Sequence, residues 1–66
     1  MQLVINGETR TFDRLAHVAA LVDALDLDPR KVAVERNLEI VPRSAYLKTP
    51  LADGDRIEIV QFVGGG

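Results

Sequence analysis

Hydrophobic and polar residues follow two different periods along the chain, and the change of period separates strands from one helix. In the middle of the first half, apolar side chains recur at Val18, Leu21, Val22 and Leu25. This spacing of i, i+3, i+4 and i+7 is typical of one face of an α-helix. A helix this short is not stable alone, so its apolar stripe must pack against other elements. The pattern therefore predicts an amphipathic helix that lies on a sheet.

The segment before the helix predicts a β-hairpin. Residues 2–6 form an apolar run that ends in Asn, and residues 8–12 contain two Thr and end in Phe, a composition that favours extended structure. The Asn6-Gly7 pair lies between them. It is the preferred pair for a two-residue type I′ turn, in which both central residues adopt positive φ.

Three further strands are predicted after the helix. Residues 31–36 and 38–41 are strand-like, with a turn at Asn37-Leu38 between them and Pro42 after the second. Pro ends a strand because it has no backbone N–H to donate. Residues 56–63 form the last and most regular strand, which begins after a predicted turn at residues 53–55.

The order strand, strand, helix, strand, strand, strand predicts a two-layer α+β domain, in which one helix packs across one face of a mixed sheet. This is a β-grasp (ubiquitin-like) fold for residues 1–63, followed by a flexible glycine tail at residues 64–66. Compactness favours the first and last strands side by side, although the sequence alone does not fix that pairing. The predicted core consists of Val4, Val18, Leu21, Val22, Leu25, Val34, Ile57 and Ile59.

Composition excludes several kinds of site. The 66 residues contain no Cys and one His, His17, so they offer no thiolate for a nucleophile or an iron–sulfur cluster and too few soft ligands for zinc. We interpret His17 as a helix-start residue rather than a general base. Asp53 and Asp55 flank Gly54 and are interpreted as a turn rather than a metal site. No bound metal or cofactor is expected.

Net charge and hydropathy limit the classes of partner that the chain is expected to bind. Eight Lys and Arg against ten Asp and Glu give a formal net charge of -2. No basic block is present to neutralise phosphates, so a nucleic acid is not expected as a partner. The amino-terminal residues lack the pattern of a signal peptide, and no apolar run reaches membrane-spanning length. A soluble, cytoplasmic protein without membrane contact is expected.

The last strand carries apolar residues on both faces. Ile57 and Ile59 share one face, and Glu58, Val60 and Phe62 share the other. A solvated strand face usually carries polar residues, so Val60 and Phe62 need an explanation. One interpretation is a partner-docking surface, with Glu58 in an acidic rim. The other is a small satellite core covered by residues 43–50, which include Tyr46. Both remain open from the sequence.

Several stretches together form a recognisable pattern: Asn6-Gly7, residues 32–35, residues 40–43, residues 51–60 and the terminal Gly65-Gly66. With this pattern the chain resembles the ThiS family, the ubiquitin-like sulfur carriers of bacterial thiamine (thiazole) biosynthesis. The resemblance covers the whole chain, and its strength comes from the order and spacing of the stretches. Departures from the family pattern lie at the helix ends, His17 and Asp26, and at Gly64.

The resemblance implies that the reactive group is the carboxylate of Gly66. It implies that a ubiquitin-activating-like adenylyltransferase, using ATP and Mg²⁺, adenylates this carboxylate. A persulfide sulfur donor then converts it to a thiocarboxylate, which thiazole synthase receives. Gly64 and Gly65 have no Cβ, so they suit a narrow tunnel in a partner. The chain itself is thus expected to be a protein co-substrate, not an enzyme.

Two other functions remain open at this point. The related carrier for molybdopterin shares the fold and the terminal Gly-Gly, so a carrier or modifier of another pathway is possible. A non-carrier β-grasp module that binds RNA is the third candidate. It should combine basic residues with exposed aromatics, whereas this chain is net negative and its aromatics are Phe12, Tyr46 and Phe62.

Overall fold

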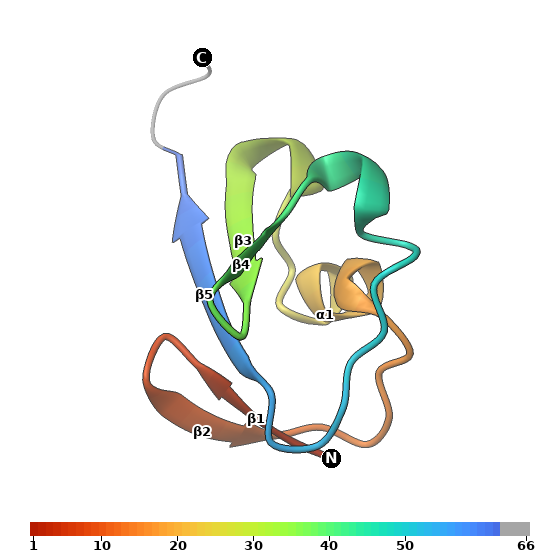
Figure 1. Ribbon diagram of the computed structural model, residues 1–66, viewed down its shortest axis with the longest axis vertical. Helices are drawn as coiled ribbons and strands as arrows, with labels where there is room; N and C mark the ends of the chain where they lie inside the picture. Colours follow the sequence, from red (N-terminus) through yellow and green to blue (C-terminus); the bar gives the residue numbers. More distant parts are fainter. Residues whose placement is uncertain (63–66) are drawn as a thin grey trace.

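The computed structural model describes residues 1–62, which form one five-stranded sheet and, within that range, one α-helix (Figure 1). No helix among these residues is long and apolar enough to cross a membrane. The strand order in the sheet is β2-β1-β5-β3-β4. The elements are β1 (Gln2–Ile5), β2 (Glu8–Thr11), α1 (Val18–Ala24), the 3-10 turn η1 (Pro29–Lys31), β3 (Val32–Arg36), β4 (Glu39–Val41), the 3-10 turn η2 (Arg43–Ala45) and β5 (Arg56–Gln61).

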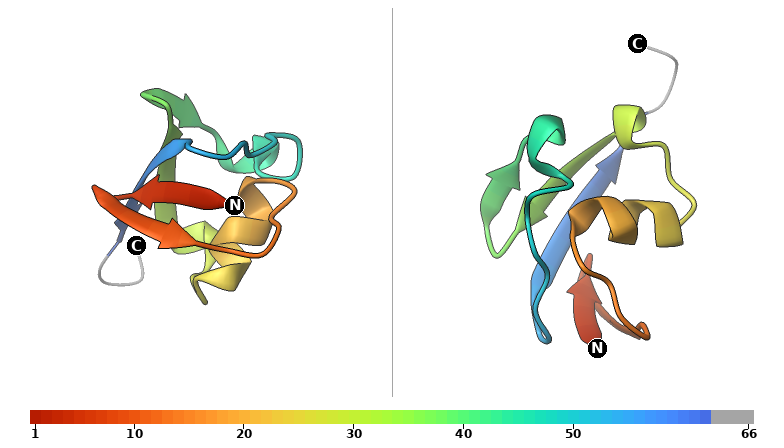
Figure 2. Two further views of the ribbon diagram at one scale, coloured as in Figure 1. Left: turned by 90° about the horizontal axis from the view of Figure 1, so that it is seen from below. Right: turned by 90° about the vertical axis from the view of Figure 1, so that its right-hand side faces the viewer.

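The last strand, β5, lies in the middle of the sheet. It pairs in parallel with β1, with Ile5 opposite Ile57, and antiparallel with β3, with Val34 opposite Ile59. The two hairpins, β1–β2 and β3–β4, are thus joined through β5. Helix α1 covers one face of this mixed sheet, as the right-hand view of Figure 2 shows. The predicted β-grasp fold and the central pairing of the first and last strands are confirmed.

Both predicted hairpin turns are confirmed in the backbone. Asn6 and Gly7 have φ values of 51° and 81°, as a type I′ turn requires. Asn37 and Leu38 have almost the same values, 51° and 71°. The second turn therefore places a leucine in the position that glycine occupies in the first.

The ends of α1 depend on two residues that are unusual for these positions. At the start, Nδ1 of His17 accepts a hydrogen bond from the backbone N–H of Ala20 at 3.1 Å, so this side chain caps the helix as a Ser or Asp would. At the end, Asp26 adopts φ 59°, and the N–H of Leu27 donates to the carbonyl of Val22 at 3.1 Å. This is the Schellman arrangement, with Asp26 in the place usually taken by Gly.

The predicted core is largely correct, but in β1 the predicted buried position is wrong by one residue. Val4 was predicted to be buried and is only partly so, whereas its neighbours Leu3 and Ile5 are buried. Because strand side chains alternate, choosing the wrong residue of an apolar run exchanges the two faces. Leu25 is also only partly buried, although it packs against the core. The remaining predicted residues, Val18, Leu21, Val22, Val34, Ile57 and Ile59, are buried, together with Val32, Val41 and Tyr46.

A buried carboxylate joins the β3–β4 turn to the start of β5. Asp55 accepts hydrogen bonds from Nε of Arg36 at 2.8 Å, Nδ2 of Asn37 at 3.1 Å and the backbone N–H of Ala52 at 2.8 Å. Burial alone would raise the pKa of Asp55, but these hydrogen bonds and the Arg36 charge outweigh it, and the pKa lies below its usual value. The predicted turn at residues 53–55 is therefore also a polar connection within the fold.

Replacing this carboxylate tests its contribution to stability. We expect Asp55→Asn to cost about 1–3 kcal/mol at neutral pH, because the charge of Arg36 loses its partner. Since folding lowers the pKa of Asp55, its stabilising effect is present above the unfolded value of about 3.9 and is lost as the pH falls through the folded value. The difference in melting temperature between wild type and variant should therefore shrink below about pH 4. Parallel curves from pH 7 to pH 2.5 would contradict this role.

Candidate functional site

The face of β5 that α1 does not cover is exposed, and we call it the open face. Val60 is 61% exposed and Phe62 is 54% exposed. Arg56 and Glu58, which precede them at every second position of the strand, are exposed as well. Tyr46 lies in the main core at 4% exposure, with its hydroxyl 3.4 Å from the carbonyl oxygen of Val32. Of the two interpretations that the sequence left open, the satellite core is therefore wrong, and both apolar side chains are exposed.

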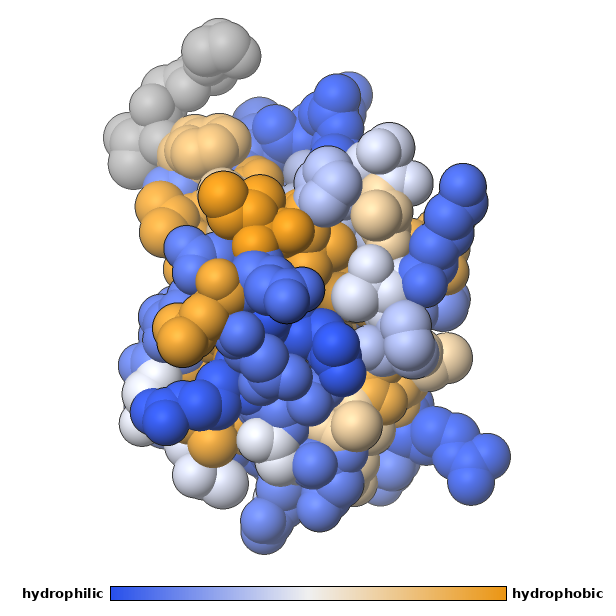
Figure 3. Space-filling view, viewed as in Figure 1, coloured by the Kyte–Doolittle hydropathy of each residue, from blue (hydrophilic) through white to orange (hydrophobic). Residues whose placement is uncertain are grey.

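Strand register brings residues of three strands together on the open face. Glu58 of β5 lies opposite Glu35 of β3, and Glu35 lies opposite Ile40 of β4. Val60 lies opposite Ala33. Figure 3 shows hydrophobic atoms gathered where β4 and the end of β5 lie, with hydrophilic atoms among them. The open face thus combines apolar side chains with a pair of carboxylates.

The sequence-based prediction missed two exposed apolar residues, one on β4 and one in the turn before it. Leu38 is 86% exposed and Ile40 79% exposed. For Ile40 a signal was available: it alternates with Val41, which is buried, so one of the two had to face solvent. Leu38 belongs to the turn, where alternation gives no information.

A shallow groove lies next to the open face, between η1 and η2. It shares Ala33, Ile40 and Phe62 with the open face, and Arg30 and Arg43 also line it. Arg30 forms an exposed ion pair with Asp28, with Nη2 and Oδ2 3.0 Å apart. The side-chain hydrogen bond from Arg30 is the main reason that the pKa of Asp28 falls to about 2.

The residue after β5 is hydrogen-bonded to the residue before β3. The N–H of Phe62 donates to the carbonyl oxygen of Lys31 at 2.8 Å. The predicted reactive residue Gly66 and the predicted tail residues Gly64 and Gly65 lie outside the described residues. Within residues 1–62, no three His, Asp or Glu side chains are grouped so that they could hold a metal ion.

Comparison with known proteins identifies the family. The sequence model of the ThiS family matches residues 3–66. The chain belongs to the ThiS family. The sulfur carrier protein ThiS of Bacillus subtilis is 48% identical over 46 residues, which are 70% of each chain. The crystal structure of the thiamine biosynthesis protein ThiS from Geobacter metallireducens, 38% identical, superposes over the full length of both chains with a TM-score of 0.84.

Two longer relatives are thiazole synthases. The protein from Paramagnetospirillum magneticum is 59% identical and that from Magnetococcus marinus 39% identical, each over all 66 residues of this chain. The chain spans only 20% of the length of either protein. In these relatives a ThiS-like segment is therefore covalently continuous with a much longer polypeptide.

The open face should tolerate charge without loss of the fold. We expect Val60→Asp and Phe62→Asp each to change the free energy of unfolding by no more than about 0.5 kcal/mol, because exposed positions contribute little packing. Ile59→Asp is the matched control. It introduces the same carboxylate at the neighbouring, buried position, where an unpaired charge is costly. Urea unfolding of the three variants checks this, and a large loss for Val60→Asp would contradict the assignment of faces.

Proposed function

We propose that the chain is a sulfur carrier of thiamine biosynthesis, with the carboxyl group of Gly66 as the sulfur-bearing group. The observation that carries the proposal is the family match, which extends over residues 3–66 and so includes the terminal glycines. The 38% identical ThiS structure supports it, since that protein is named for thiamine biosynthesis and has the same fold over its full length. The chain acts as a protein co-substrate, and ATP and Mg²⁺ are bound by its activating enzyme.

The proposed chemistry follows from the properties of a carboxylate. With a pKa of about 3.3–3.7, a terminal carboxylate is ionised at neutral pH and is a poor electrophile. The adenylyltransferase lets it attack the α-phosphorus of ATP, which releases pyrophosphate and leaves an acyl-adenylate. The terminal sulfur of a protein persulfide then attacks the carbonyl carbon and displaces AMP. A thiol cleaves the resulting S–S bond and leaves the thiocarboxylate, which thiazole synthase receives.

In this proposal the folded domain is the part of the chain that the partner enzymes recognise. Val60, Phe62 and Glu58 form the surface that docks on the activating enzyme. Four residues follow Phe62, and a fully extended chain spans at most about 3.6 Å per residue. The reacting carbon therefore lies within about 14 Å of the docking surface. Recognition and reaction must occur close together on the partner.

The terminus is the most direct test. Deleting Gly66, or appending one residue after it, should abolish ATP-dependent sulfur loading because the activating site would hold the wrong carbonyl. A misplacement of about 1 Å can cost roughly a hundredfold in rate. Gly65→Leu should block loading by steric exclusion instead. The measurement is the intact mass after incubation with activating enzyme, ATP and sulfur donor, which reports the replacement of one oxygen by sulfur. Loading of the truncated and extended forms at the wild-type rate would end the carrier proposal.

The docking surface has a separate test. Val60→Asp and Phe62→Asp should each weaken binding to the activating enzyme by about tenfold or more, because a carboxylate replaces an apolar contact. Leu47→Asp is the control, since Leu47 is an exposed leucine on the segment after η2. Titration calorimetry gives the affinities. If both open-face variants bind like wild type, the enzyme docks elsewhere.

A further inference from the structure

The tip of the β3–β4 hairpin holds a leucine in a conformation suited to glycine. Leu38 has φ 71°, and the preceding Asn37 has φ 51°. The chain contains its own reference, because Asn6 and Gly7 form the same turn with φ values of 51° and 81°. Left-handed φ brings a Cβ too close to the following carbonyl oxygen. Asn lessens this problem with a local hydrogen bond, but Leu has no such group. The second turn is therefore strained where the first is not.

Leu38 gains no packing that would offset this strain. Its side chain is 86% exposed, and Ile40, two residues later, is 79% exposed. Gly or Asn at position 38 would fit the turn better and would remove an exposed apolar side chain. An outlier in backbone conformation that is also an exposed hydrophobic residue is a reason to look for a function.

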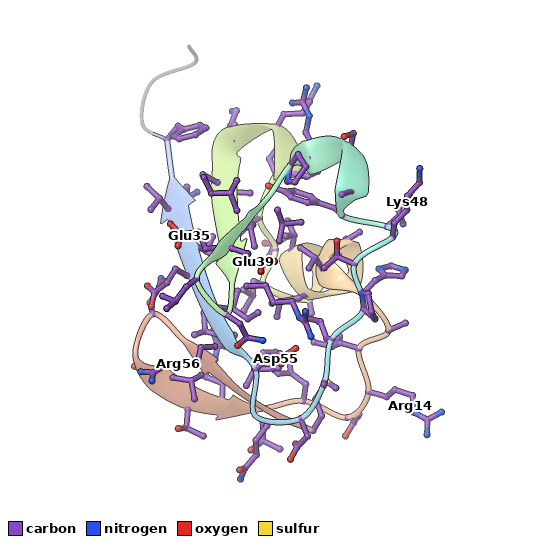
Figure 4. All side chains as sticks on the ribbon, viewed as in Figure 1. Arg14, Glu35, Glu39, Lys48, Asp55 and Arg56 are labelled. Atoms are coloured by element: carbon purple, nitrogen blue, oxygen red, sulfur yellow. The ribbon has the colours of Figure 1, made fainter. Side chains whose placement is uncertain are left out.

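The open face carries a second unfavourable arrangement. Glu35 and Glu58 lie directly opposite each other on β3 and β5, and like charges in that position destabilise a sheet. Within residues 1–62 neither carboxylate takes part in an ion pair. Ile40 lies on the other side of Glu35, directly opposite it on β4. Figure 4 shows Glu35 beside β5, whereas Glu39 lies opposite Arg36 and alternates with Ile40, so it belongs to the other face of the sheet.

We propose that these residues form a recognition surface for thiazole synthase. Leu38 and Ile40 enter an apolar pocket of the synthase, and a Lys or Arg side chain of the synthase lies between Glu35 and Glu58. Charge complementarity selects this chemistry, because a cation there removes the repulsion between the two carboxylates. The inference rests on the proposed function in taking the synthase as recipient. The two thiazole synthases that contain a segment similar to the whole chain support that choice.

Leu38 lies toward the opposite end of β5 from Phe62, whereas Ile40 and Phe62 line the same groove. The N–H of Asn37 donates to the carbonyl oxygen of Arg56 at 2.7 Å, so the hairpin tip lies beside the first residue of β5, whereas Phe62 follows its last. Glu58 lies between the two ends and belongs to both surfaces. The synthase would thus be recognised partly by residues that the activating enzyme does not need.

The decisive signature is a gain in stability together with a loss of binding. Leu38→Gly should raise the melting temperature by about 4 °C or more, since relief of strain in a domain this small has a large effect on it. It should weaken binding to the synthase by about tenfold or more, because one buried Leu is lost from the interface. Glu35→Gln should also weaken binding, and the remaining affinity should depend less on salt. Calorimetry with the synthase of the same organism at two salt concentrations measures both effects.

Two matched variants separate strain from recognition. Gly7→Leu creates the same conformation in the other hairpin, where an added Cβ meets no atom within 4 Å. It should lower the melting temperature by about as much as Leu38→Gly raises it, without changing synthase affinity. Leu47→Asn removes an exposed leucine next to Lys48, which lies on the side of the molecule away from Glu35 (Figure 4). It should also leave affinity unchanged.

The outcomes distinguish this inference from the proposed function. Wild-type affinity in Leu38→Gly overturns the recognition surface and leaves the carrier function intact. Loss of both stability and binding in that variant also overturns it, because the turn is then not strained. If the wild-type chain does not bind the synthase at either salt concentration, the synthase is not the recipient and this inference falls with that assignment. Sulfur loading at Gly66 is measured without the synthase, so it still decides the carrier function.

Discussion

The structure depends on the position of β5 between β1 and β3. Neither hairpin pairs with the other, and β5 joins them through a parallel ladder on one side and an antiparallel ladder on the other. The burial of Ile57 and Ile59 under α1 holds β5 in place. Because strand side chains alternate, the same burial forces Glu58, Val60 and Phe62 to the other face. The core and the open face are therefore two results of one constraint.

The sequence predicted features whose cause is local. Asn6-Gly7 specifies its turn without help from the rest of the chain, and the i, i+3, i+4, i+7 spacing specifies α1. Strict alternation along β5 placed Val60 and Phe62 on the face opposite Ile57 and Ile59, but it did not decide whether that face is covered. The assignment of Gly66, by contrast, came from family resemblance alone, since no property of a terminal glycine by itself indicates sulfur chemistry.

The sequence failed where the cause is distant or ambiguous. In the run Leu3-Val4-Ile5 every residue is apolar, so alternation did not indicate which of them faces the core, and Val4 was chosen wrongly. Asp55 looked like an ordinary turn residue. Its partners Arg36 and Asn37 are 19 and 18 residues away, and only the folded chain brings them together.

Small size makes the unfavourable features of the open face informative. A domain of 66 residues buries only about 60% of the surface of its unfolded chain, so its stability is limited. Strain at exposed Leu38 costs on the order of 1 kcal/mol and the like-charge pair of Glu35 and Glu58 less, which are noticeable amounts on that scale. Natural proteins keep such suboptimal residues as long as stability stays above what function needs. The proposed contacts would give these particular residues a role beyond folding.

Reach sets a further condition on the proposed cycle. Phe62 is hydrogen-bonded to Lys31, the residue before β3, and Gly66 lies at most about 14 Å beyond it. Each enzyme that acts on Gly66 must therefore bring its own active site close to the open face. Because Glu58 belongs to both proposed docking surfaces, the activating enzyme and the synthase cannot occupy this face together. The carrier must dissociate from the activating enzyme before it binds the synthase. Sulfur transfer between the two enzymes therefore favours interfaces that are specific but weak. Charged groups at the edge of an apolar patch meet that requirement, since they contribute more to partner choice and association rate than to affinity.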